Sequence, residues 1–109
     1  MKIIYFKTSS GREPVKEYIN GLQQNDVEII TKHLSSIQKY GHHASDVIFR
    51  KIKGKLWEIK TGVGIQQRIF YVIALDDTMI LLHACKKQKT GSQPDDVDLA
   101  SKRMKEVLS

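Results

Sequence analysis

Three cations of this 109-residue chain are placed so that they could act together on a phosphate group. Lys60 and Arg68 stand within short apolar runs rich in β-forming residues, and Lys87 closely follows a third such run. Side chains alternate between the two faces of a strand, so these cations can share one face while Ile, Leu and Val fill the other. The planar fork of Arg binds phosphate oxygens bidentately, and Lys adds a point charge. Such a face suits a polyphosphate backbone, which makes RNA the first substrate to consider.

RNA can be cleaved without a metal. The ribose 2′-oxygen attacks the adjacent phosphorus, so an enzyme must activate that oxygen, stabilise the charged phosphorane and protonate the leaving 5′-oxygen. We expect Arg68 to contact the phosphate with Lys87 beside it, and His83 or Lys60 to handle a proton. His83 stands four positions before Lys87 and is predicted to face the same side. Two alternatives stay open: His83 as a hydrogen-bonded, half-buried residue, and Arg68 as a structural residue paired with Glu58 on the neighbouring strand.

The overall charge also favours a polyanionic partner. Lys and Arg number 18 against 12 Asp and Glu, which gives a net charge of +6 at pH 7. Contacts of Lys and Arg with phosphates release condensed counterions, and this release drives binding to nucleic acid. The cations concentrate just before the apolar run over 56–60 and just after the apolar run over 78–85. We therefore expect RNA or ribosome contacts from Arg50, Lys51, Lys53, Lys55, Lys86 and Lys89.

No metal or cofactor is expected. Cys85 is the only cysteine, so no intramolecular disulfide can form, and its apolar neighbours favour a buried, inert thiol. The alternative is a nucleophilic Cys85 paired with His83, since residues two apart share a strand face. His42 and His43 are adjacent in a predicted loop, where neighbouring side chains rarely point at one ion. No Cys or acidic residue stands at ligand spacing from them.

The elements that must position these residues follow from hydrophobic spacing and turn signals. Pro14 and Pro94 suit the first turns of helices, and Asn25 or Asp26 suits a helix cap. The predicted elements are a strand over 2–7, helices over 14–22 and 26–40, strands over 56–60, 67–74 and 78–85, and a helix over 94–108.

The order β-α-α-β-β-β-α predicts an α+β fold with a mainly antiparallel four-stranded sheet. The helix pair would cover one face, a C-terminal helix would follow the last strand, and the basic face would remain open. Residues 1–109 are expected to form a single domain. No charged-then-apolar leader opens the chain and no apolar run approaches the ~18 residues of a membrane span, so we expect a cytoplasmic protein without a membrane partner.

Three motifs in this order, followed by a terminal helix, resemble the RelE/HigB superfamily, and in particular its phage-derived HigB-like branch. The motifs are Lys-Leu-Trp-Glu-Ile-Lys (55–60), Arg-Ile-Phe-Tyr-Val (68–72) and Leu-Leu-His-Ala-Cys-Lys-Lys-Gln-Lys-Thr (81–90). The resemblance implies a RelE-like fold and the toxin of a type II toxin–antitoxin system. Such a toxin is an endoribonuclease that cuts messenger RNA on the ribosome without a metal and so inhibits translation. A cognate helix-turn-helix (HigA-like) antitoxin is the implied partner, and ribosomal RNA is a further one.

Positions of the family pattern carry over to particular residues. The Arg of the middle strand falls on Arg68, the cation that ends the preceding strand on Lys60, and the strand-end pair on Lys86 and Lys87. Members of the RelE branch also carry a catalytic tyrosine near the start of the last helix. Residues 94–99 contain none, which leaves this role to His83 or a lysine.

Two other classes of function fit the same composition. A basic RNA- or DNA-binding module without catalysis would explain the charge and the open sheet. A phage-derived interaction protein could bind another protein through the same face. Toxicity on expression, relieved by the neighbouring open reading frame, would separate the toxin from both alternatives.

Overall fold

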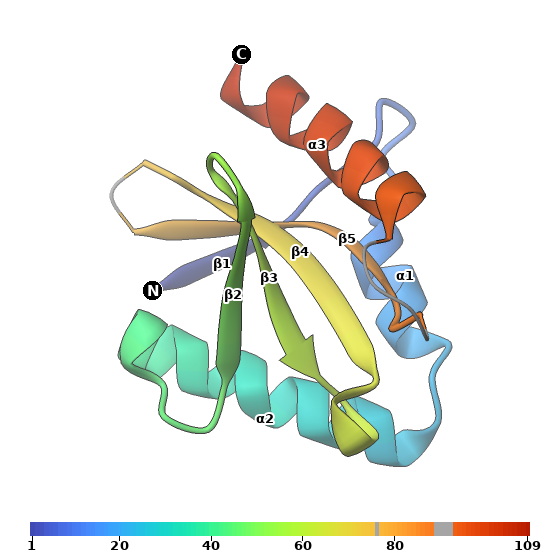
Figure 1. Ribbon diagram of the computed structural model, residues 1–109, viewed down its shortest axis with the longest axis vertical. Coiled ribbons are helices and arrows are strands. Elements are labelled where there is room, and N and C mark those ends of the chain that lie inside the picture. Colours follow the sequence, from blue (N-terminus) through green and yellow to red (C-terminus); the bar gives the residue numbers. More distant parts are fainter. Residues whose placement is uncertain (76, 89–92) are drawn as a thin grey trace.

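The computed structural model describes residues 1–75, 77–88 and 93–109. Its strands are β1 (Lys2–Tyr5), β2 (Ile48–Lys53), β3 (Leu56–Thr61), β4 (Gln67–Ala74) and β5 (Thr78–Lys86), and its helices are α1 (Pro14–Asn20), α2 (Gln24–Tyr40) and α3 (Pro94–Leu108). The strands form one sheet in the order β1-β5-β4-β3-β2 (Figure 1). β1 pairs with β5 in parallel, and the other neighbours pair antiparallel. Short 3-10 turns at Gly41–His43 and Val63–Ile65 follow α2 and β3.

The α+β fold with a mainly antiparallel sheet is confirmed, but the sheet has five strands rather than the four predicted. The missed strand is β2, in which only Phe49 and Ile52 are partly buried. β2 lies at the edge of the sheet beside β3, so most of its side chains face solvent and several are cations. The charge of these exposed positions hides the apolar alternation that marks the inner strands.

Other boundaries differ by a few residues from those predicted. The first strand ends at Tyr5 and the first helix at Asn20, while the second helix begins at Gln24. Asp26 does not cap that helix, because its Oδ1 accepts a hydrogen bond from the Val63 backbone N–H at 2.8 Å. This bond ties α2 to the turn after β3.

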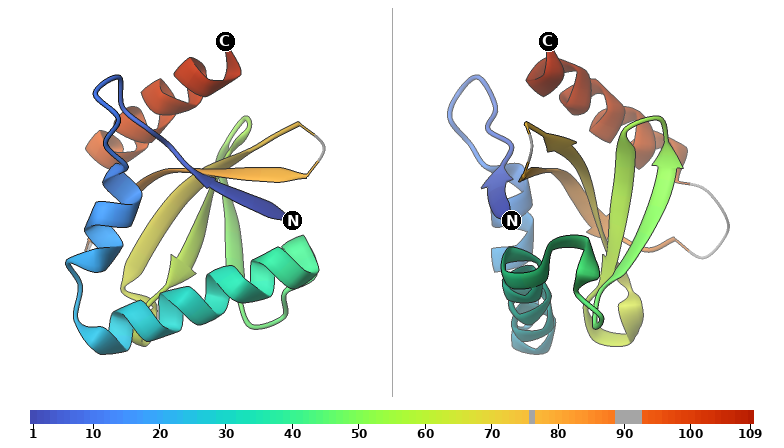
Figure 2. Two further views of the ribbon diagram at one scale, coloured as in Figure 1. Left: turned by 180° about the vertical axis from the view of Figure 1, so that it is seen from behind. Right: turned by 90° about the vertical axis from the view of Figure 1, so that its left-hand side faces the viewer.

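Different helices pack on the two faces of the sheet (Figure 2). α1 and α2 pack on one face through a core that includes Val15, Ile30 and Ile59. On the other face, Val97, Ala100 and Met104 of α3 pack against sheet residues such as Leu56 and Phe70. The prediction that this second face remains open was therefore wrong in part: an amphipathic helix must bury its apolar stripe, and α3 does so here. The cations lie on the part of this face that α3 leaves accessible.

A β-bulge in β5 sets the direction of His83. Phe70 of β4 lies opposite His83 and the next residue, Tyr71, lies opposite Leu81, so Leu82 is an extra residue in the ladder. Leu82 packs in the α3 core, and the His83 ring also faces α3, where it meets Asp96. Strict alternation from Leu81, which belongs to the core under α1 and α2, would have turned His83 toward those helices.

Candidate functional site

Cations from neighbouring strands surround one cavity on the α3 side of the sheet. Lys60 lies directly opposite Arg68 in the β3–β4 ladder, and Lys87 follows the end of β5. Arg50 of β2 joins them. This basic cavity has a volume of about 290 Å³ and is lined by Arg50, Glu58, Lys60, Arg68, Lys87, Gln88 and Gln93. The period of two along each strand thus brings together the cations chosen from the sequence, while their chemical roles stay predictions.

Glu58 lies at the base of the basic cavity, between two arginines. Its side chain is 2% exposed, and its Oε1 accepts a hydrogen bond from Arg50 Nε at 2.8 Å and lies 3.7 Å from Arg68 Nε. Arg68 is itself buried and donates through Nη1 to the backbone oxygens of Ile65 (2.6 Å) and Gln67 (3.1 Å). The ion pair between Arg68 and Glu58, the alternative raised by the sequence, is therefore present.

The same contacts define the electrostatics of Arg68. Burial lowers the pKa of its guanidinium, the Glu58 carboxylate opposes this shift, and the charge of Arg50 adds to it. Because an arginine pKa lies far above neutrality, Arg68 stays cationic. A charged group fixed by a carboxylate and two carbonyls has little freedom to reorganise. Such preorganisation is useful for stabilising a charged transition state.

His83 lies on the same side of the sheet as Lys87, as predicted, but it does not line the basic cavity. Its Nε2 donates to Asp96 Oδ1 at 2.7 Å, and its ring stacks on Phe70 with centroids 6.0 Å apart. Burial by itself raises the pKa of Asp96, but hydrogen bonds from His83 and Gln93 outweigh it and hold that pKa below its usual range. The geometry matches the alternative of a hydrogen-bonded, half-buried histidine.

The other cations divide into two groups. Lys51, Lys53 and Lys55 are exposed along β2 and the turn that follows it. Lys86 lies on the opposite face from Lys87, beside Tyr18 and Asp26 of the α1–α2 layer. These two consecutive lysines therefore line different cavities and do not form the cation pair that the family pattern implies. Lys89 lies outside the described residues.

Comparison with known families gives one match that covers most of the chain. Residues 17–105 match the family of phage-derived Gp49-like proteins (DUF891). The chain belongs to this family. Gp49-like proteins are a RelE/HigB-like toxin family, in agreement with the resemblance of the strand motifs at the level of the superfamily. No curated protein matches the chain significantly. Within the described residues, no helix of this Gp49-like protein is long and apolar enough to cross a membrane.

Sequence reasoning missed two polar residues that organise this Gp49-like site. Gln93 donates through Nε2 to Cys85 Sγ (3.2 Å), Lys86 O (3.2 Å) and Asp96 Oδ2 (3.0 Å). Asp96 accepts from both Gln93 and His83. Their position around Pro94, at the start of a predicted helix, gave no sign of these contacts, because the contacts depend on how α3 docks against β5.

His83, Cys85 and Asp96 could in principle hold a metal ion, since one ligand atom from each lies within 4.8 Å of the others. This mixed nitrogen, sulfur and oxygen set would suit zinc. All three atoms, however, already take part in hydrogen bonds. Burial, reinforced by the Asp96 charge, also raises the pKa of the Cys85 thiol to about 12, which disfavours the thiolate that zinc requires. The arrangement fits a hydrogen-bonded network better than a metal centre.

We therefore expect little zinc in the purified protein. After incubation with zinc and desalting, elemental analysis should find well below an equimolar amount, and Cys85→Ser should not change it. Tightly bound zinc at one ion per chain, absent from the Cys85→Ser protein, would show a metal centre and contradict the metal-free mechanism.

Proposed function

We propose that this Gp49-like protein is the toxin of a type II toxin–antitoxin system, and that it cleaves messenger RNA on the ribosome without a metal. The observation that carries the proposal is the basic cavity: Arg50, Lys60, Arg68 and Lys87 surround it in a chain of a RelE/HigB-like family. A cavity of this charge suits a phosphate group of an RNA backbone.

The proposed reaction is an attack of the ribose 2′-oxygen on the adjacent phosphorus. The 2′-hydroxyl gives up its proton to a base as its oxygen bonds to phosphorus. The bond from phosphorus to the 5′-oxygen breaks, and the 5′-oxygen takes up a proton, which leaves a 2′,3′-cyclic phosphate and a 5′-hydroxyl. Arg68 stabilises the negative charge of the phosphorane, and Lys87 lies beside it. Lys60 lines the basic cavity and His83 does not, so position favours Lys60 over His83 for handling a proton.

The partners of the proposed toxin follow from the same assignment. We place the protein in the phage-derived HigB-like branch, whose antitoxin is a helix-turn-helix protein. The antitoxin would neutralise the toxin, and messenger RNA and ribosomal RNA would bind its basic surface. The proposed site of action is therefore the ribosome in the cytoplasm.

Controlled expression tests this proposal. Induction of the chain alone should stop growth and protein synthesis, and co-expression of the neighbouring open reading frame should restore both. Messenger RNA from the arrested cells should carry new ends at positions engaged by ribosomes. Lys39→Ala, which removes an exposed cation on α2, the helix on the other face of the sheet from the basic cavity, should remain toxic. Unimpaired growth without new RNA ends, despite accumulation of folded protein, would contradict the proposal.

A basic RNA-binding module without catalysis is the second candidate. It is favoured by the fact that Arg68 and His83 each already have a carboxylate partner. Sheet platforms that bind RNA generally expose aromatic rings for base stacking. Here Phe70 is 1% exposed and Tyr71 is fully buried, so β4 offers no such platform. Binding of RNA without new ends would support this candidate over the toxin.

The exposed lysines of β2 and of the turn that follows it should bind phosphate groups of the ribosome and take no part in the cleavage reaction. Replacing Lys51, Lys53 and Lys55 together by Ala should weaken ribosome binding. The slope of log affinity against log salt should fall by about one for each phosphate group that these lysines neutralise in the wild type. Binding measured across a salt series checks this expectation.

A second triple variant controls for the change in net charge. Lys39, Lys102 and Lys105 are also exposed but lie on α2 and α3. Their joint replacement by Ala removes the same charge and should leave the slope almost unchanged. Equal slopes for the two triple variants would mean that the β2 edge does not face the ribosome.

A further inference from the structure

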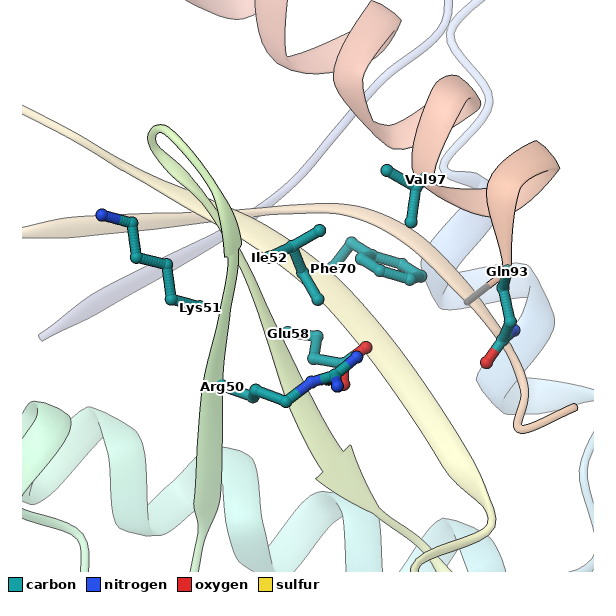
Figure 3. A pocket seen from close by; sticks show the side chains of 7 residues that line it. All are labelled: Arg50, Lys51, Ile52, Glu58, Phe70, Gln93 and Val97. Carbon is teal, nitrogen blue, oxygen red and sulfur yellow. Dashed lines mark hydrogen bonds and ion pairs between the residues drawn. The ribbon is translucent and has the colours of Figure 1, made fainter. Parts of the chain in front are cut away.

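The basic cavity shares a wall with a second cavity of different chemistry. Arg50, Glu58 and Gln93 line both. Beyond this wall, the second cavity is bounded by Ile52 of β2, Phe70 of β4 and Val97 of α3, and we call it the apolar-walled cavity (Figure 3). Lys51 contributes to its edge, but its side chain points away from the others in this view. The two cavities are therefore adjacent parts of one depression between the sheet and the start of α3.

The chemistry of the two parts matches the two parts of a nucleotide. A phosphate needs cations and hydrogen-bond donors, which the basic cavity supplies. A base needs apolar surface for its ring faces and a polar group at its edge. In the apolar-walled cavity, Ile52 and Val97 are partly buried hydrophobic side chains that lie on two sides of Phe70. The volume of about 200 Å³ lies below the roughly 300–1,000 Å³ of pockets for drug-sized ligands, so a single ring system fits the space best.

Gln93 supplies the polar group, and its contacts fix whether the nitrogen or the oxygen of its side-chain amide faces the ligand. Its Nε2 lies against three acceptors: Cys85 Sγ, Lys86 O and Asp96 Oδ2. An amide surrounded in this way must present its nitrogen to them and its oxygen elsewhere. Figure 3 shows the oxygen end of Gln93 on the side of the cavity. Gln93 Oε1 already accepts one hydrogen bond, from the Gln88 backbone N–H at 3.4 Å, and a carbonyl oxygen can accept a second. Gln93 therefore offers a fixed hydrogen-bond acceptor, through the second lone pair of Oε1, at the boundary between the two cavities.

We infer that the apolar-walled cavity binds one base of the RNA strand whose phosphate occupies the basic cavity, an inference that rests on the proposed function. Gln93 Oε1 selects a base with an exocyclic amino group over uracil. The amino group projects beyond the ring and donates to an acceptor on the cavity wall. The only ring N–H of uracil lies between two carbonyl oxygens, which repel the Gln93 oxygen. Gln93 is thus the specificity-determining residue of the site.

Titration with mononucleotides tests this inference without requiring cleavage. Cytidine and uridine 5′-monophosphates differ at the ring position that carries an amino group or a carbonyl oxygen, and ribose 5-phosphate lacks the base. NMR spectra of the intact protein, labelled at Ile and Val methyls and at arginine side chains, report on both cavities. All three compounds should shift the Arg68 Nε–H signal. Only the two nucleotides should shift the Ile52 and Val97 methyls, and the cytidine nucleotide should bind about two- to tenfold more tightly, the range of one net hydrogen bond.

The possible failures are distinguishable. If Arg68 responds and the Ile52 and Val97 methyls do not, the base site is wrong and the phosphate site of the proposed function stands. Equal affinity for the two nucleotides overturns the selection by Gln93. If Arg68 responds to none of the three compounds, the phosphate site fails, and the base site that depends on it fails as well.

Matched variants give a second measurement. Val97→Phe should fill the apolar-walled cavity and reduce nucleotide affinity to that of ribose 5-phosphate. Leu99→Phe adds an aromatic ring to the same helix outside this cavity and should bind nucleotides as the wild type does. Ile52→Ala removes apolar surface from the opposite wall, and severalfold weaker nucleotide binding is expected even if Val97→Phe fails to fold. Wild-type affinity in a folded Val97→Phe protein or in Ile52→Ala would overturn the inference.

Discussion

Arg68→Ala should lower the single-turnover rate of messenger RNA cleavage on the ribosome by a factor of about 10²–10³. This is the loss that follows when one preorganised stabiliser of a charged transition state is removed. Arg68→Lys should restore only part of the rate, because an ammonium group keeps the charge but loses the bidentate fork. A lysine also cannot reproduce the guanidinium contacts with Ile65 O and Gln67 O on one side and Glu58 on the other.

The ion pair with Glu58 gives Arg68 a competing, structural role that the experiment must separate. If Arg68 only supports the fold, Arg68→Ala would lower thermal stability and ribosome binding together, without slowing cleavage in the molecules that fold and bind. Arg50→Ala is the matched control, since Arg50 pairs with the same Glu58 oxygen but its side chain is 57% exposed. It should lower the rate much less. An Arg68→Ala protein that is folded, bound to the ribosome and as fast as the wild type would refute the site assignment.

Glu58→Gln should lower the free energy of unfolding by about 3 kcal/mol, as expected when one member of a buried ion pair is removed. Glutamine keeps the shape of Glu58 but leaves the charge of the buried Arg68 without its counter-charge. The basic cavity admits water beside these groups, which places the expected value at the lower end of the range for buried pairs. Denaturant unfolding monitored by circular dichroism measures the change.

An exposed ion pair on the same molecule provides the control. Glu17 pairs with Arg12 at the start of α1, and both side chains are largely solvent-exposed. Glu17→Gln should change stability little, because water already screens both charges. A double-mutant cycle of Glu58→Gln with Arg68→Met should also show strong coupling, since the second change removes the charge that the first leaves uncompensated. Equal effects of Glu58→Gln and Glu17→Gln would mean that Glu58 does not hold Arg68 in place.

The sequence alone determined which side chains can share a face. The spacing along each inner strand predicted that Lys60 and Arg68 lie together, and that His83 and Lys87 face one side. It also predicted β4 and α3 with the observed limits. These features follow from the geometry of one strand or one helix, whose periods of 2 and 3.6 residues set the order of apolar and polar residues. The edge strand β2 escaped detection because exposure to solvent removes that pattern.

Only the tertiary structure decided which partners the side chains on these faces contact. The extra residue in β5 turns His83 toward α3, and the docking of α3 gives it Asp96 as a partner instead of a place in the basic cavity. The pairing of β2 with β3 places Arg50 on Glu58, so that one carboxylate serves two arginines. Gln93 acquires its role only through contacts with β5. The register of the strands and the docking of α3 depend on the packing of elements that are distant along the chain. The residue periodicity of a single element carries no information about that packing.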